Sequence, residues 1–209
     1  MKDAIRADAV PVLPGQWDRS LLEPLADINL QLLDALLESA AEGAPRSRLC
    51  GELRADWLRL TGDGCRRLAS CPYLLLDAAF AEPVYWSAVL VPGVREQSVP
   101  GSGRASDVCL AAGLVRRALV LAWHLARSNP LAARIALGMS ESCTALVAQC
   151  RLHDLELLAE QRPEWIRPRW EDRPDIWRSL LRAAVTDRET PLRQLQMRGL
   201  QLLAAGLRA

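Results

Sequence analysis

Apolar residues recur at helical spacing along most of the chain, and the alternation typical of a half-buried strand is nearly absent. The clearest example is the segment 20–42, where leucine and isoleucine are spaced three and four residues apart. Ser20 is a candidate N-cap at its start, and Gly43 and Pro45 are stop signals at its end. The same criteria predict helices over residues 48–60, 64–70, 72–81, 106–128, 130–137, 140–149, 152–161, 173–185 and 191–207.

Two segments interrupt this helical pattern. Residues 84–91 are strand-like, but a single short strand cannot form a sheet alone. Residues 92–105 contain two prolines, three glycines and two serines, a composition that indicates a linker or mobile loop. We therefore predict an all-α fold in which an N-terminal helical unit (1–91) and a C-terminal helical unit (106–209) flank the linker and pack together.

The two units share a spacing pattern. Cys65 and Cys143 are each followed by a leucine at +3, by Ala-Glu at +16 and by a tryptophan at +21 or +22. A Leu-rich helix is predicted within both intervals. The pattern indicates an internal duplication of one helical unit, with coincidence in a Leu/Ala-rich chain as the alternative.

The charge balance argues against a generally nucleic-acid-binding surface. The 209 residues contain 26 basic and 25 acidic side chains, for a net charge of +1, so binding to nucleic acid would need a local patch. Half of the residues are hydrophobic, as in a globular protein. We find no signal-peptide core and no run of 18 apolar residues, and we therefore expect a cytoplasmic protein without membrane insertion.

No motif predicts catalysis, a cofactor or a metal site. The six cysteines include no Cys-x-x-Cys pair, and Cys65, Cys143 and Cys150 fall at helical positions where cysteine acts as a small apolar residue. His124 and His153 have no nucleophile or metal ligand nearby in sequence. Phosphate-binding loops and nucleophile elbows are absent from the sequence. We expect a protein that is not an enzyme, an unrecognised catalytic site being the alternative.

Residues 132–149 have the outline of a helix-turn-helix. Gly138 suits the turn, and Ser140 is a candidate N-cap for the second helix. This second helix contains no Arg, Lys or Asn, and only Gln149 could bind a base edge with two hydrogen bonds. The segment therefore predicts a packed helical pair better than a reader of DNA sequence.

Arginine and tryptophan are concentrated in residues 162–182, which contain six of the first and three of the second. Both residue types anchor interfaces. Arg167, Arg169 and Arg173, with Trp170, are thus candidates for contact with phosphates or with a protein partner. The alternative is structural: Trp170 and Trp177 would pack into the core while the arginines pair with nearby acids. These acids are Glu171, Asp172 and Asp175.

Short motifs of the C-terminal half are similar to those of one known family. They are Leu121-Ala122, Arg127-Ser128-Asn129, Leu137-Gly138, Glu141, Leu146, Leu158-Ala159-Glu160 and Arg167-Pro168-Arg169-Trp170-Glu171-Asp172. In this order they resemble the FlhD family of flagellar transcriptional regulators. In the first half, residues 27–30 are similar to the start of the family's N-terminal helix, and residues 58–60 to its aromatic-Arg-Leu turn.

This resemblance implies an all-helical, dimerising protein that activates transcription together with a second subunit. The chain departs from the family in being about twice its usual length. Ala136 stands where the family has an arginine before Leu-Gly, whereas Arg59 keeps that arginine in the first half. Arg59 therefore joins the candidate binding residues.

Two functions remain in competition. The leading hypothesis is a non-enzymatic transcriptional co-regulator that contacts a protein partner or second regulatory subunit, and contacts DNA only weakly, through Arg59, Arg167, Arg169, Trp170 and Arg173. The alternative is a cytosolic accessory or adaptor protein of a bacterial type III secretion or flagellar apparatus. Self-association into a homo-oligomer is compatible with both.

Overall fold

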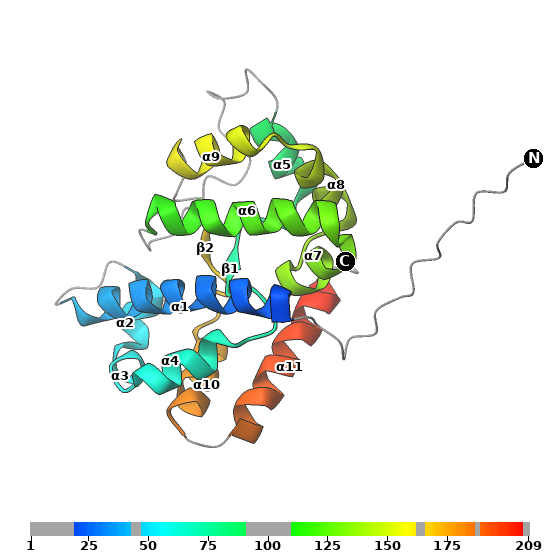
Figure 1. The fold of residues 1–209 in the computed structure, drawn as a ribbon. Helices are drawn as coiled ribbons and strands as arrows, with labels where there is room; N and C mark the ends of the chain where they lie inside the picture. Colours follow the sequence, from blue (N-terminus) through cyan, green and yellow to red (C-terminus); the bar gives the residue numbers. More distant parts are fainter. Residues whose placement is uncertain (1–18, 43–46, 91–109, 162–165, 187–188, 207–209) are drawn as a thin grey trace, which may run out of the picture.

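The computed structural model describes residues 19–42, 47–90, 110–161, 166–186 and 189–206 (Figure 1). The fold of this part of the chain is all-α, as the hydrophobic pattern predicts, with one small two-stranded sheet. The first half contains α1 (Arg19–Ala41), α2 (Arg48–Glu52), α3 (Arg54–Trp57), α4 (Gly62–Ala69), β1 (Leu76–Asp77) and α5 (Pro83–Leu90). The second half contains α6 (Ala112–Ser128), α7 (Pro130–Leu137), α8 (Glu141–Gln149), α9 (Leu152–Gln161), β2 (Arg167–Pro168), α10 (Pro174–Val185) and α11 (Glu189–Gly206).

Several helix ends agree with the prediction, but Ser20, the expected N-cap of the first helix, lies within α1, which begins at Arg19. The helices predicted over 130–137 and 152–161 have those bounds in the structure. Asn129 caps α7 by accepting a hydrogen bond from the backbone of Ala132, and Gly138 ends the helix in the left-handed conformation, with φ of 66°. Ser140 caps α8 as predicted. Local chemistry alone is therefore sufficient to place these boundaries.

The prediction of a helix over 72–81 is wrong. This segment is not helical and consists of bends and the short strand β1, because its backbone groups bond to distant parts of the chain. The Leu74 N–H donates to the Ala136 carbonyl at 2.9 Å, and the Leu75 N–H donates to the Asn29 side-chain oxygen at 2.8 Å. These tertiary hydrogen bonds replace the local ones that a helix would make.

Two further predictions for the first half need correction. The helix predicted over 48–60 is divided into α2 and α3 by Leu53, whose φ of −110° and ψ of 15° are not helical. The strand-like residues 84–90 form α5, which begins at Pro83, since proline suits the first turn of a helix. The linker predicted at 92–105 lies outside the described residues.

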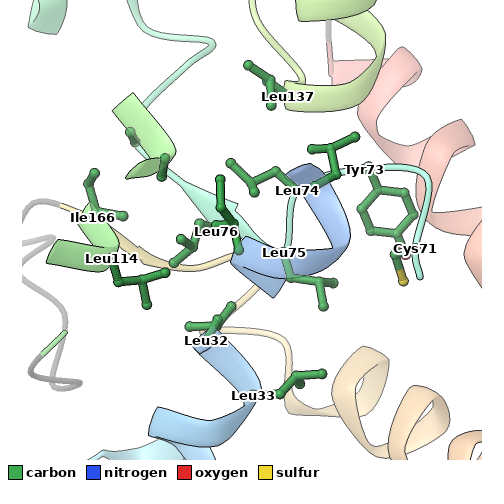
Figure 2. Packing of buried hydrophobic residues seen from close by; sticks show 14 of the residues in the cluster. Leu32, Leu33, Cys71, Tyr73, Leu74, Leu75, Leu76, Leu114, Leu137 and Ile166 are labelled. Carbon is green, nitrogen blue, oxygen red and sulfur yellow. The ribbon is translucent and has the colours of Figure 1, made fainter. Parts of the chain in front are cut away.

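The small sheet joins the two halves of the chain. Strands β1 and β2 are antiparallel, with Leu76 opposite Pro168 and Asp77 opposite Arg167. In Figure 1 they lie between α6 and α1, near the middle of the structure. The residues before β1 are buried between helices of both halves: Figure 2 shows Leu74, Leu75 and Leu76 among Leu32 and Leu33 of α1, Leu114 of α6 and Leu137 of α7.

Helices of each half pack on helices of the other half. Helix α5 packs against α8, whereas α10 packs against α3 and α4, and α1 packs against α6. Buried hydrophobic residues from both halves form a single cluster. The ranges 1–91 and 106–209 therefore share one core, and neither range has a separate one among the described residues.

The structure shows matched details at corresponding places in the two halves. Each strand is followed, two residues after its end, by a residue with positive φ: Ala79 at 51° and Trp170 at 56°. Trp86 donates its indole N–H to the carbonyl eight residues before it, at 3.1 Å. Trp177 makes the same bond to the carbonyl eight residues before it, at 2.7 Å.

The exchange of α5 and α10 predicts that the halves stay together after the chain is cut between them. A protease recognition sequence introduced within residues 91–109 should yield two fragments that elute as one species with the mass of the whole chain. The physical reason is that each fragment alone would expose the apolar residues that the other covers. Size-exclusion chromatography with light scattering measures this, and separate elution of the fragments without denaturant would contradict it.

Candidate functional site

Arg169, a predicted binding residue, is buried in the core. Only 6% of it is exposed, and its guanidinium donates to the carbonyls of Leu74, Leu76 and Leu137, each at 2.8 Å. Burial lowers the pKa of this arginine, and Asp77, whose carboxylate lies 3.9 Å away, acts in the opposite direction. The Nε and Nη2 donors of Arg169 thus bind backbone carbonyls inside the protein, which argues against the expected contact with a phosphate or a partner.

Trp170, next to Arg169, and Arg167, two positions before it, are half-buried. Trp170 packs edge-on against Tyr73, with ring centroids 5.8 Å apart. Arg167 lies 3.9 Å from the carboxylate of Asp77. Trp177 is fully buried, 5.5 Å from the ring of Trp57. The structural alternative for the Arg/Trp segment thus describes both tryptophans better than the binding hypothesis does.

Arg173 and Arg59 remain on the surface. The exposed Arg173 donates to Asp175, and this pairing raises the pKa of Arg173 and lowers that of Asp175. Arg59 is exposed and makes no hydrogen bond or ion pair with another described residue. Of the five predicted residues, these two have the side chains most available to a partner.

Helices α7 and α8 have the geometry of a helix-turn-helix but not its usual surface. They are bent by 119° at a turn containing Gly138, within the range of this motif. The exposed residues of α8 are Glu141, Ser142, Ala145 and Gln149. None of these is basic, and the other side of α8 packs against α5. The helix has no cation for the DNA backbone, in agreement with the sequence-based expectation.

The structure contains an open groove that the sequence analysis did not identify. Its lining comes from α1, α6 and α9, and its volume is about 480 Å³. In Figure 1, α9 and α1 lie on opposite sides of α6. The apolar lining consists of Pro24, Ile28, Val120, Leu121 and Leu152. Leu152 is 37% exposed, and Val120 and Leu121 are half-buried, so a partner could still cover substantial apolar surface.

Polar side chains, four of them acids or arginines, surround this apolar lining. They are Asp27 on α1, Arg116, Arg117 and His124 on α6, and Glu156 on α9. None of the two acids and two arginines forms an ion pair with another described residue, although Arg–carboxylate pairs occur elsewhere in the protein. Unpaired charges beside exposed apolar side chains are typical of a surface that binds another macromolecule.

Local sequence explains how the groove forms. Arg116, Val120 and His124 are spaced four residues apart, so they share one face of α6. The turn between α8 and α9 is fixed to α6 because the indole N–H of Trp123 donates to the Cys150 carbonyl at 3.0 Å. An Arg-Arg pair in an otherwise apolar helix was the available sequence signal. That signal could not identify α1 and α9 as the walls.

The described cysteines are free and buried, as predicted for Cys65, Cys143 and Cys150. Burial raises the pKa of Cys71 to about 12 and that of Cys150 to about 11. Burial also raises the pKa of Cys50, Cys65 and Cys143. A raised pKa lowers the thiolate fraction at neutral pH, and the thiolate is the nucleophile. These residues therefore have the properties of packing groups.

This burial predicts negligible alkylation of the native protein. In a Cys109→Ser background, iodoacetamide at pH 8 should label none of the five described cysteines while the protein is folded, and all of them in denaturant. Intact-mass spectrometry at successive times measures the labelling. Rapid modification of one native cysteine would show an accessible thiolate and reopen the question of nucleophilic chemistry at that residue.

Comparisons with known proteins give no match: a scan of protein families, a search of curated proteins and a search of solved structures each find nothing similar to this chain.

Among the described residues, no group of three or more His, Cys, Asp or Glu side chains could hold a metal ion. No single described helix is long and apolar enough to cross a membrane, although α7 and α8 together reach that length and composition across their bend.

Proposed function

We propose that this chain is a non-enzymatic helical regulatory protein that acts by binding another protein, in the role of a transcriptional co-regulator. The observation that carries the proposal is the open groove between α1, α6 and α9, where partly exposed apolar side chains lie beside unpaired charges. Interfaces commonly combine an apolar centre with a polar rim. The resemblance to the FlhD family is a second, independent support.

Direct DNA binding takes a minor place in this proposal. Arg169 is buried, Arg173 is paired with Asp175, and the exposed face of α8 has no basic side chain. The groove itself contains Asp27 and Glu156, which would repel phosphates. DNA contact is thus limited to surface arginines such as Arg59, which fits weak binding beside a second subunit that reads the sequence.

The adaptor of a secretion or flagellar apparatus is the second candidate. The net charge of +1 and the apolar groove favour a protein partner over nucleic acid, and both observations fit a scaffold as well as a co-regulator. The identity of the bound protein separates the two candidates.

The test is site-specific photo-crosslinking in the native host. A photoreactive amino acid replaces Val120 in the groove, and a matched control carries it at the exposed Gln201 of α11. We expect one partner, identified by mass spectrometry, at position 120 and not at 201, and weaker binding of that purified partner to Leu152→Glu. A transcription factor or polymerase subunit supports the co-regulator, and a secretion component supports the adaptor. Equal capture at both positions would contradict the proposal.

DNA binding is tested separately by fluorescence anisotropy. With random-sequence duplex at low salt, we expect weak binding at most. Contact with about six phosphates would instead cost roughly a thousandfold in affinity between 50 and 200 mM salt. Tight binding with that steep dependence would place DNA, not protein, as the main partner.

We also propose that the two halves arose from one duplicated helical unit, in a different register from that predicted. Leu76 and Arg167 begin the two strands and are 91 positions apart. With this spacing, the equivalent of Trp86 is Trp177 and not Trp165. Leu76 moved 91 positions forward is Arg167, and Pro168 moved 91 positions back is Asp77. The first residue pair of the sheet, Leu76–Pro168, is therefore equivalent to its second pair, Arg167–Asp77. The register of the sheet is thus the one that a two-fold arrangement requires.

The capping residues support the same relation. Thr61 and Ser140 each accept a bond from the backbone N–H three residues on, at 3.1 Å in both cases. They are 79 positions apart, and the strands are 91 apart, so the second half has an insertion of 91 − 79 = 12 residues between them. Helix α9, with 10 residues, occupies this insertion. The Leu-rich helix α9 therefore has no counterpart in the first half, where the leucines at 74–76 lead directly into β1.

A further inference from the structure

We infer that the occupant of the groove between α1, α6 and α9 is an amphipathic partner helix of about two turns, with basic residues on both flanks and negative charge at one end. This inference rests on the proposed function, because it describes the partner that the regulatory protein would bind. It follows from the length of the groove, the apolar side chains at its floor and the separate positions of its charges.

The length of the groove is set by α6. Its lining residues extend from Arg116 to His124, and eight steps of about 1.5 Å correspond to about 12 Å along the helix axis. An antiparallel or parallel partner helix would use about eight residues to cover this distance. Such a helix presents apolar side chains at i, i+3 or i+4, and i+7, which suits a short floor made mainly by Val120 and Leu121.

The openness of the groove favours a helix over a small molecule. Small ligands usually lose about 70–90% of their surface to the protein. Leu152, at 37% exposure, and the half-buried Val120 remain accessible to solvent. A helix resting on them would bury its own apolar stripe and keep its opposite face in water, so it needs no lid.

The acids and arginines of the groove determine which charges the partner helix carries on its two flanks and in which direction it lies. Asp27 belongs to α1 and Glu156 to α9, and these two helices lie on opposite sides of α6 (Figure 1), so both edges of the partner should carry Lys or Arg. Arg116 and Arg117 lie at the N-terminal end of this stretch of α6. The C-terminal end of a helix carries partial negative charge, so that end of the partner, with an Asp or Glu, should lie beside the two arginines.

The presence of both acidic and basic side chains in the groove argues against a nucleic acid and against a uniformly acidic peptide as the partner. A nucleic acid would meet two carboxylates in the groove, and a uniformly acidic peptide would meet the same repulsion. The partner thus has to supply cations at its edges and an anion at its end. The arrangement specifies orientation as well as affinity, since a reversed helix would place like charges together.

The first experiment measures peptide binding to the full-length protein by fluorescence anisotropy. The probe is a stapled helix of about three turns with leucine along one face, lysine on both edges and glutamate at its C-terminal end. The comparison peptide has glutamate in place of each lysine. We expect micromolar binding of the probe and about tenfold weaker binding of the comparison peptide, since replacing lysine with glutamate removes the exposed ion pairs and puts like charges in their place.

Charge reversal on the protein provides the decisive control. The double variant Asp27→Arg/Glu156→Arg should reverse the preference, binding the glutamate peptide more tightly than the lysine peptide. Glu38→Arg, an exposed position on α1 outside the groove, should leave the preference unchanged. Circular dichroism confirms folding of each variant. Equal binding of both peptides to the wild type, or no reversal in the folded double variant, would overturn the inference.

The outcomes separate this inference from the proposed function. If the peptides fail but crosslinking at position 120 still captures a defined protein, the helical occupant is wrong and the regulatory function stands. If the peptides behave as expected but no cellular protein is captured, the groove chemistry stands and the proposed function fails. Self-association of the wild type that Leu152→Glu abolishes would identify a second copy as the occupant and overturn the partner helix.

Discussion

Arg169→Ala is expected to lower the free energy of unfolding by about 3–5 kcal/mol, the usual cost of breaking a buried charged network. The guanidinium donates to three carbonyls, those of Leu74, Leu76 and Leu137, and comes within 3.9 Å of Asp77. Alanine would leave these carbonyls without a donor in the interior and the carboxylate without its nearby cation. Each such carbonyl adds to the cost because it was solvated in the unfolded chain.

Urea denaturation followed by circular dichroism measures this effect. Arg173→Ala is the matched control, since it removes an exposed arginine four positions away and should change stability by less than about 0.5 kcal/mol. Arg169→Lys should fall between the wild type and Arg169→Ala, because lysine keeps the charge but not the planar fork of donors. A cost below 1 kcal/mol for Arg169→Ala would contradict the buried position of this side chain.

Asn29→Ala is expected to cost about 3–4 kcal/mol, at the upper end of single substitutions. Asn29 is fully buried in α1. Its amide donates to the carbonyls of Ala69 and Tyr73, at 3.1 and 3.0 Å, and its oxygen accepts from the Leu75 N–H at 2.8 Å. One side chain therefore satisfies three backbone groups between the last residue of α4 and β1, and alanine would remove all three of these bonds.

The control for this variant is Asp34→Ala, on the exposed face of the same helix, which should have little effect. Hydrogen exchange adds a local measurement: the Leu75 amide should lose its protection in Asn29→Ala before the amides of α6 do. Unchanged protection at Leu75, together with wild-type stability, would contradict the role of Asn29. Asn29→Ser, which retains one short polar group, should recover only part of the loss.

Both substitutions also affect how binding experiments are interpreted. Arg169 and Asn29 hold the segment before β1, and this segment lies between helices of both halves. Loss of partner binding in either variant would follow from loss of the fold. Evidence for a binding role therefore has to come from exposed positions such as Leu152 and Asp27, where substitution leaves the core intact.

The sequence alone was sufficient for the helical class and for most helix boundaries. Apolar residues at helical spacing require one buried face, and Ser140, Asn129 and Gly138 act within one turn of their own positions. The burial of Cys65 and Cys143 followed from the same periodicity. These features depend on neighbours close in sequence, which is why a pattern along the chain can predict them.

Only the tertiary structure determined the non-helical segment before β1, the inward direction of Arg169 and the groove. Residues 72–77 have the leucines of a helix, but their backbone groups form hydrogen bonds with Ala136, Asn29 and Arg169 instead of with one another. Arg169 points inward because three carbonyls separated from it by tens of residues converge there. The groove likewise needs α1, α6 and α9 together. Such contacts join distant positions, and the periodicity of a single segment carries no information about them.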